Sequence, residues 1–290
     1  MQFAIGSIMY YRYPCFLGIF LFFLNIQCSE PDEISFQSPA GYDLTKPYVI
    51  KLPVELDEIS GVAYYAADTS VFAIGDEFGY LYKIPLTPNK PIRKWKFSNL
   101  GDFEDLAMVD KVFYVLQSDG GITTFTFDAK NTVLTNHLDF PLEGSEFEIL
   151  YYNPHQFKLV MICKDCEEDK KKALTVFHFN LLKRSFDDSS SINVTSIASM
   201  IGEKKIKFKP SAAALNPVTD ELFIVSAVNK LLVVADRNGR PKATYPIDGR
   251  IFKQPEGITF TPAGDMIISN EAADRGVANL LFFKYKKPGT

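Results

Sequence analysis

Short apolar runs alternate with polar turns along most of the chain, and the alternation recurs at a nearly constant interval. Four of the recurring units begin at a glutamate, as "EISGVAYY" from Glu58, "EDLAMV" from Glu104, "EILYYN" from Glu148 and "EGITFT" from Glu256. A related unit, "SAAALNP", begins at Ser211. Successive units start 46, 44, 63 and 45 residues apart. A period of about 45 residues is typical of a repeat architecture.

Each unit contains the pattern of four short strands. A first strand follows the glutamate, and a turn rich in Asp, Asn, Pro and Gly separates it from an apolar second strand such as "VFAIG" or "LFIVS". Third and fourth strands follow, such as "YLYKI" and "KATYPI". Four antiparallel strands in this length predict one blade of a β-propeller. The continuous apolar second strands fit burial on both faces between neighbouring blades.

Five units predict an all-β fold, a five-bladed β-propeller over residues 47–288. The last unit ends without a fourth strand of its own, and the segment "KPYVIKLPVE" at 46–55 precedes the first unit. We expect this N-terminal strand to complete the last blade, which would remove an open sheet edge. The unit of 63 residues carries an insertion in which "SIASMIG" could form a short helix. That insertion is too short for a further blade, so a six-bladed ring is less favoured.

The first 28 residues predict a lipoprotein-type signal segment. The apolar run "CFLGIFLFFL" at 15–24 is too short for a membrane span and has the length of a signal-peptide core. Cys28 follows and would be the lipidated first residue of the mature chain, although "LNIQ" lacks the usual small residue before it. An ordinary cleaved signal peptide or an uncleaved anchor is the alternative. Residues 29–46 read as a polar tether, so we expect a membrane-anchored domain facing the periplasm or exterior of the cell envelope.

Composition narrows the range of partners. The chain is 47% hydrophobic and 14% aromatic, which excludes global disorder. A net charge of −4 argues against nucleic acid as a partner and is compatible with a divalent cation or a cationic ligand. The pair Cys163 and Cys166 could supply half a zinc site, act in redox chemistry or form a local disulfide in an oxidising compartment.

Carboxylates recur at equivalent places in the units, just before the first strand and just after the second. In a propeller the first strand lines the central channel, so we expect these side chains to converge at the channel mouth. In the fourth unit, Ser211 takes the position that glutamate has before the first strand in the other units. Asp119 belongs to the acids that come just after a second strand. Clustered oxygen ligands favour calcium. The predicted calcium ligands are Glu58, Asp76, Glu104, Glu148, Asp165, Glu256 and Glu271.

One other interpretation of the carboxylates remains open. The glutamates could accept hydrogen bonds from backbone N–H groups of the adjacent blade and thereby hold the ring together without a metal.

The sequence shows no serine hydrolase triad, because no GxSxG motif occurs and His137, His155 and His178 have no nucleophile in a suggestive context. These histidines also lie outside the repeated motif, which makes a zinc or iron centre less favoured.

The motifs "LDEISGVAY", "GDFEDLAMV", "KPSAAALNPVTDELFIVSA" and "QPEGITFTPAGDMIISNE" resemble the SdiA-regulated family of bacterial envelope proteins. The resemblance covers about residues 48–286 and implies a five-bladed propeller outside the cytoplasm. It also implies that the matching glutamates and Glu271 are candidate functional residues, since some relatives are calcium-responsive and phytase-like.

The leading hypothesis is a calcium-binding module that presents a ligand or partner surface at the funnel. One alternative is a calcium-dependent, phytase-like phosphoesterase, for which Lys164, Lys209, Lys253 and Arg275 could bind phosphates. A metal-free scaffold is the other.

Overall fold

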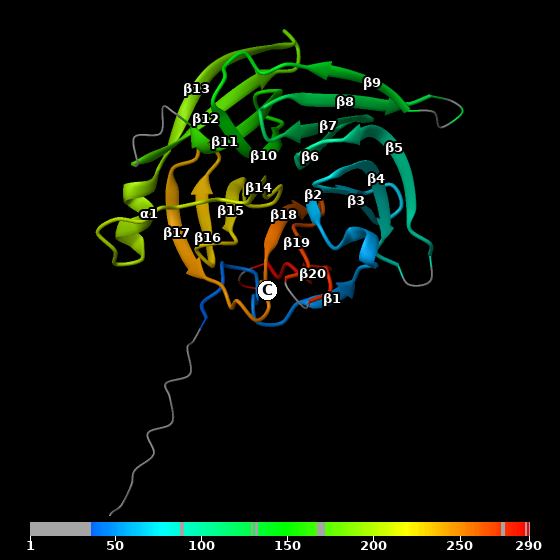
Figure 1. The fold of residues 1–290 in the computed structure, drawn as a ribbon. Coiled ribbons are helices and arrows are strands. Elements are labelled where there is room, and N and C mark those ends of the chain that lie inside the picture. The colour runs from blue at the N-terminus through cyan, green and yellow to red at the C-terminus, as the bar shows by residue number, and fades with distance from the viewer. Residues whose placement is uncertain are drawn as a thin grey trace, which may run out of the picture. The chain divides into compact units, whose positions relative to one another are not determined.

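A computed structural model describes residues 36–87, 90–128, 130, 133–166, 172–273, 276–287 and 289. Five four-stranded antiparallel sheets are arranged in a ring around a central axis (Figure 1). The first strand of each blade lies innermost and the fourth outermost. The predicted five-bladed β-propeller is therefore confirmed.

The first two blades follow the chain order without interruption. Blade 1 consists of β2 (Ile59–Tyr65), β3 (Ser70–Gly75), β4 (Phe78–Pro85) and β5 (Arg93–Leu100). Blade 2 consists of β6 (Phe103–Val109), β7 (Val112–Gln117), β8 (Ile122–Phe127) and β9 (Val133–Leu138).

The third blade has longer strands and carries the inserted helix. Blade 3 consists of β10 (Ser145–Asn153), β11 (Lys158–Cys166), β12 (Ala173–Asn180) and β13 (Ser185–Asn193). The helix α1 (Val194–Met200) follows, and the side chain of Asn193 caps it by accepting a hydrogen bond from the amide of Ser196 at 3.0 Å. Blade 4 consists of β14 (Ala212–Leu215), β15 (Glu221–Ser226), β16 (Leu231–Asp236) and β17 (Pro241–Pro246).

The last blade joins the two ends of the chain. Blade 5 consists of β18 (Pro255–Phe260), β19 (Met266–Asn270), β20 (Asn279–Phe283) and the N-terminal strand β1 (Tyr48–Lys51). Antiparallel pairing of β1 with β20 sets Tyr48 opposite Phe282 and Lys51 opposite Asn279. A short 3-10 turn at Val54–Leu56 then leads into blade 1. The expected closure by the N-terminal strand is confirmed, and it removes the open edge that blade 5 would otherwise expose.

The folded part of the chain begins before residue 47. We expected 29–46 to be a polar tether, but Tyr42 and Leu44 are buried in the apolar cluster between blades 4 and 5. The hydroxyl of Tyr42 donates to the carbonyl of Gly264 at 2.5 Å and accepts from the side-chain amide of Asn216 at 2.7 Å. These contacts fasten the segment to turns of both blades. Only residues 29–35 of the expected tether lie outside the described part of the chain.

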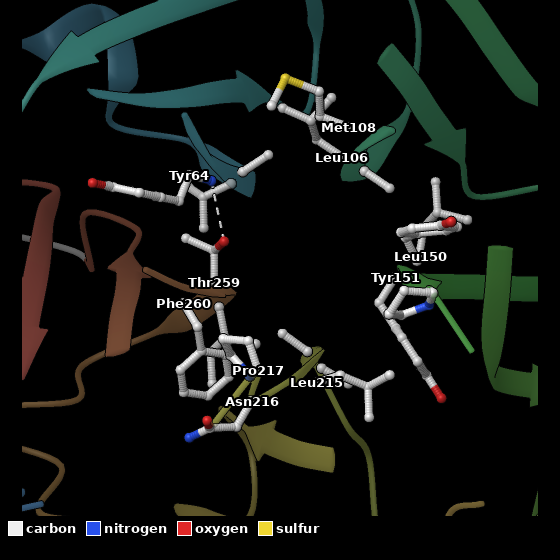
Figure 2. A pocket seen from close by; sticks show the side chains of 18 of the residues that line it. Tyr64, Leu106, Met108, Leu150, Tyr151, Leu215, Asn216, Pro217, Thr259 and Phe260 are labelled. Atoms are coloured by element: carbon white, nitrogen blue, oxygen red, sulfur yellow. Dashed lines mark hydrogen bonds between the residues drawn. The ribbon is translucent and has the colours of Figure 1, made fainter. Parts of the chain in front are cut away.

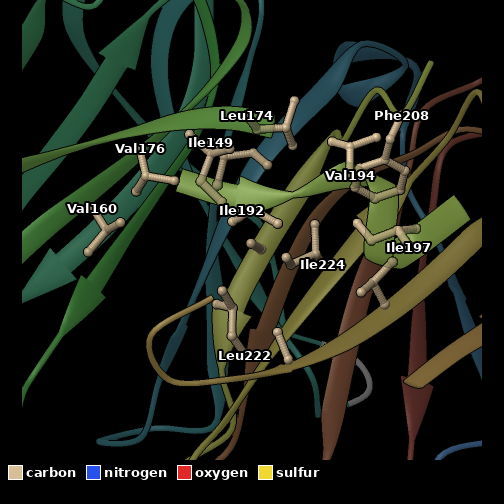
Figure 3. Packing of buried hydrophobic residues seen from close by; sticks show 14 of the residues in the cluster. Ile149, Val160, Leu174, Val176, Ile192, Val194, Ile197, Phe208, Leu222 and Ile224 are labelled. Atoms are coloured by element: carbon tan, nitrogen blue, oxygen red, sulfur yellow. The ribbon is translucent and has the colours of Figure 1, made fainter. Parts of the chain in front are cut away.

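Apolar side chains fill the spaces between neighbouring blades. Between blades 3 and 4, Val176 and Ile192 face Ile224 and Leu222, and Ile197 of α1 covers the outer end of the cluster (Figure 3). The second strands are buried on both faces, which explains why their sequences are continuous apolar runs.

Two further observations concern the described residues. Cys163 and Cys166 form a disulfide at the end of β11, which selects the disulfide among the three possibilities for this pair. No helix in the described ranges is both long and apolar enough to cross a membrane.

Candidate functional site

Carboxylates from four blades face one cavity of about 270 Å³ at the end of the channel where the inner strands begin. The cavity is lined by Glu58, Ser60, Asp76, Asp102, Glu104, Glu148, Lys164, Ser211, Gln254, Glu256 and Glu271. Six of the seven predicted ligands are therefore brought together. The side chain of the seventh, Asp165, is outside what the structure describes. Whether these residues bind a metal stays a prediction.

Three of the recurrent glutamates occupy the same kind of backbone irregularity. In β6, Phe103 pairs with Gln117 and Asp105 pairs with Leu116, so Glu104 between them has no partner on β7. Equivalent register shifts leave Glu148 unpaired in β10 and Glu256 unpaired in β18. A β-bulge of this type changes the direction of the side chain that it carries. The bulges thus explain why glutamates next to buried strand residues reach the channel.

The clustered acids raise each other's proton affinity. Burial, followed by repulsion from Glu148, raises the pKa of Glu104 to about 8 and that of Glu256 to about 8. Burial, followed by repulsion from Asp76, raises the pKa of Glu271 to about 7. Desolvation disfavours the charged form, and neighbouring negative charges add to this effect. The cavity therefore retains bound protons at neutral pH.

Positive charge in the cavity comes from Lys164 alone among the lining residues. Lys164 forms an ion pair with Glu148, and the amide of Gln254 donates to Glu271. The Oδ1 atom of Asp76 is buried and has no hydrogen-bond partner. Within the described ranges, no three His, Cys, Asp or Glu side chains form a ready-made metal site. Among the described residues, the lining carboxylates other than Glu148 thus form no ion pair with a cationic side chain.

Two residues named with this set in the sequence do not line the cavity. Asp119 accepts a hydrogen bond from the amide of Gly121 at 2.9 Å within its own turn. Lys209 is not among the lining residues, and its backbone amide donates to the side chain of Asn229. Asp119 thus stabilises its own turn, whereas the charge of Lys209 still favours the ionised form of Glu148.

A different acid performs the blade-joining role that the glutamates could have had. Asp105 is buried, and its carboxylate accepts from the amide of Leu106 at 2.7 Å and from the amide of Leu150 on blade 3 at 2.8 Å. Burial raises the pKa of Asp105 well above its usual range. No recurrent glutamate makes such a bond to a neighbouring blade among the described residues. Gly61 of blade 1 packs against the backbone of blade 2 at Asp105 and Leu106. A Cβ added to Gly61 would lie 2.3 Å from the Leu106 nitrogen.

The channel becomes apolar toward the opposite ends of the inner strands. A second cavity there, of about 510 Å³, is surrounded by β2, β6, β10, β14 and β18 (Figure 2). Leu106, Met108, Leu150 and Leu215 line it, and the side chain of Thr259 accepts from the amide of Tyr64 at 3.1 Å. The sequence indicates this change from acidic to apolar lining, because the residues two and four positions after Glu104 are Leu106 and Met108. We did not predict this cavity.

The ring of blades and the carboxylates at one end of its axis define the protein as a five-bladed β-propeller with an acidic channel mouth. The family model described as SdiA-regulated matches residues 49–274. The chain belongs to the SdiA-regulated family, as the sequence motifs indicated. No curated protein matches the chain by sequence.

Solved structures that are similar to this chain match it at low sequence identity. The glutaminyl cyclase of Myxococcus xanthus has 12% identity and a TM-score of 0.56, covering 81% of this chain and 95% of that one. A luciferin-regenerating enzyme has 10% identity and a TM-score of 0.49, covering 82% and 95%. A chain of a nidogen/laminin complex has 12% identity and a TM-score of 0.47, covering 73% and 72%. At 12% identity, the similarity to the glutaminyl cyclase shows a common fold only.

Proposed function

We propose that the acidic cavity binds calcium and that the protein is a binding module of the cell envelope. The convergence of carboxylates from blades 1, 2, 3 and 5 on one cavity carries the proposal. Gathering these charges raises their pKa values and is unfavourable unless protons or a cation neutralise them. A divalent cation would relieve the repulsion.

The donor set fits calcium better than a softer metal. All the acidic lining groups offer oxygen, and calcium accepts six to eight oxygen ligands in irregular geometry. Glu148 is already paired with Lys164, so the ion would be held by the other predicted ligands that line the cavity, Glu58, Asp76, Glu104, Glu256 and Glu271. The buried, unpartnered Oδ1 of Asp76 supplies an oxygen at no cost in broken hydrogen bonds. When bound, the ion would supply positive charge to recognise an anionic group of a ligand.

Isothermal titration of the mature domain tests calcium binding. We expect binding, a rise in melting temperature, and stabilisation of about 2.7 kcal/mol at a hundredfold excess over the dissociation constant. The double variant Glu104→Gln, Glu256→Gln should lose the response. Glu203→Gln is the matched control, because Glu203 is exposed and lies outside the cavity. A parent protein that binds no calcium at millimolar concentration would refute the proposal.

Lys164 supports a second candidate, a calcium-dependent phosphoesterase of the phytase-like kind. A phosphate substrate needs cationic contacts, and Lys164 lines the cavity beside the acids. Lys209 and Lys253 do not line it, and Arg275 lies outside the described residues. Release of phosphate from phytate with calcium, abolished by Glu104→Gln with Glu148→Gln, would favour this candidate. Calcium binding without phosphate release would leave the binding module as the function.

The location in the envelope is a proposal that concerns residues outside the described part of the chain. Cys28 follows an apolar run of signal-peptide length and would carry the lipid. Two or three acyl chains hold a protein firmly on a membrane, whereas one holds it weakly. The variant Cys28→Ala should leave the membrane fraction or accumulate as a precursor. Unchanged fractionation and migration would show that Cys28 is not the attachment site.

A further inference from the structure

A serine, a histidine and an aspartate meet in a cavity of about 200 Å³ between blades 3 and 4. The hydroxyl oxygen of Ser190 lies 3.0 Å from Nε2 of His178. The other ring nitrogen of His178, Nδ1, lies 3.8 Å from Oδ1 of Asp188. This cavity shares no lining residue with the acidic cavity. The group is therefore separate from the proposed calcium site.

The pairing of β12 with β13 brings the three residues together. Val176 pairs with Ser190, and a register shift between Phe177 and Phe179 places His178 at a β-bulge. Because side chains alternate along a strand, Asp188 and Ser190 share the face of β13 that is turned toward blade 4. The sequence did not reveal this group because its nucleophile and base lie on different strands, without a GxSxG motif.

His178 has the surroundings of a base. Its side chain is only 12% exposed, and Nδ1 is buried without a hydrogen-bond partner. Burial lowers the pKa of His178, so the ring is neutral at neutral pH. With the hydroxyl of Ser190 donating to Nε2, the ring proton lies on Nδ1 and faces Asp188. Lys158 donates to the same carboxylate oxygen, with its ammonium nitrogen 2.7 Å from Oδ1.

We propose that Ser190, His178 and Asp188 form a nucleophilic site that hydrolyses esters of small carboxylic acids. Nucleophile and base are within hydrogen-bonding reach, and the contact between base and carboxylate is of the looser kind found before substrate binds. Arg237 of blade 4 is the only Lys or Arg that lines the cavity among the described residues, and it would stabilise a developing oxyanion. The small volume limits the acyl group to a few carbon atoms.

The reaction balances with water as the only co-substrate. The Ser190 oxygen attacks the acyl carbon while its proton passes to Nε2 of His178, and Asp188 stabilises the imidazolium that forms. Collapse of the tetrahedral adduct breaks the ester bond, and the alkoxide leaves with the proton from His178. Water then attacks the acyl-serine and gives its proton to His178. The carboxylic acid leaves, and the proton returns to Ser190.

Two measurements on the mature protein test the site. A fluorophosphonate probe should form a covalent adduct, with loss of fluoride, that peptide mass mapping places on Ser190. The hydrolysis rate of p-nitrophenyl acetate should fall at least about 100-fold in Ser190→Ala, and it should also fall in Asp188→Asn. An adduct on another residue, or none, would overturn the proposal.

The chain supplies matched controls beside the nucleophile. Ser189 and Ser191 are exposed neighbours on the same strand, and strand alternation turns them to the opposite face. Ser189→Ala and Ser191→Ala should retain the parent's labelling and hydrolysis. If Ser190→Ala hydrolyses the ester as fast as Ser189→Ala, the group has a structural role only. Because all three variants remove one hydroxyl from an exposed strand, unfolding does not complicate the comparison.

Discussion

Replacing Glu256 with glutamine should remove much of the pH dependence of the propeller's stability. The folded carboxyl has a pKa of about 8, raised first by burial and then by repulsion from Glu148. In the unfolded chain the pKa returns to about 4.3. Between these values the folded state binds a proton that the unfolded state has lost. The stabilisation is therefore fully present below pH 4 and is lost as the pH rises toward 8.

The size of the effect follows from the shift in pKa. One pKa unit corresponds to about 1.4 kcal/mol, so the full shift of Glu256 would give an upper limit of about 5 kcal/mol. The side chain is only partly buried, and the neighbouring carboxyls share the bound protons, so we expect roughly 1–3 kcal/mol. In a domain of this size each kcal/mol changes the melting temperature by about 2–4 °C.

Thermal unfolding followed by circular dichroism between pH 5 and pH 8.5, with a chelator present, measures this effect. The parent should lose stability as the pH rises, while Glu256→Gln should lose much less, because glutamine cannot ionise. Glu203→Gln should follow the parent. Calcium should stabilise the parent more at high pH than at low pH, since its ligands must be deprotonated. If Glu256→Gln loses as much stability over this range as the parent, the raised pKa of Glu256 is not the cause.

Substitutions at three further positions test the contacts that join the blades, each by urea unfolding. Asp105→Ala should lower the free energy of unfolding by about 2–4 kcal/mol, because it leaves the buried amide of Leu150 without a hydrogen-bond acceptor. Asp105→Asn should lower it less. Gly61→Ala should destabilise by about 1–3 kcal/mol or more, because its Cβ would overlap the backbone of blade 2. Tyr42→Phe should cost about 1–2 kcal/mol through the lost hydrogen bond to Gly264. A cost below 0.5 kcal/mol in any of them would contradict the role assigned to that contact.

Patterns of period 45 and the alternation within strands were enough to predict the blades, because they report burial directly. The tether boundary was misplaced because Tyr42 and Leu44 are isolated apolar residues in a polar segment and show no periodicity. Sequence also could not separate the roles of adjacent acids. Glu104 faces the channel and Asp105 joins two blades because a bulge leaves Glu104 without a partner on β7, and a bulge depends on strand pairing. The Ser190 and His178 contact depends on pairing in the same way.

The contacts of Tyr42 have a mechanical consequence if the protein is anchored through its N-terminus. Any pull between the membrane and a bound partner then enters the fold through the residues that precede β1. The segment around Tyr42 meets this force before β1 does, and Tyr42 distributes it over turns of blades 4 and 5 through Asn216 and Gly264. The β1–β20 ladder is only four residues long, and a force applied directly to its end would separate its pairs one after another. Tyr42 therefore shields from tension the one strand that holds the ring closed.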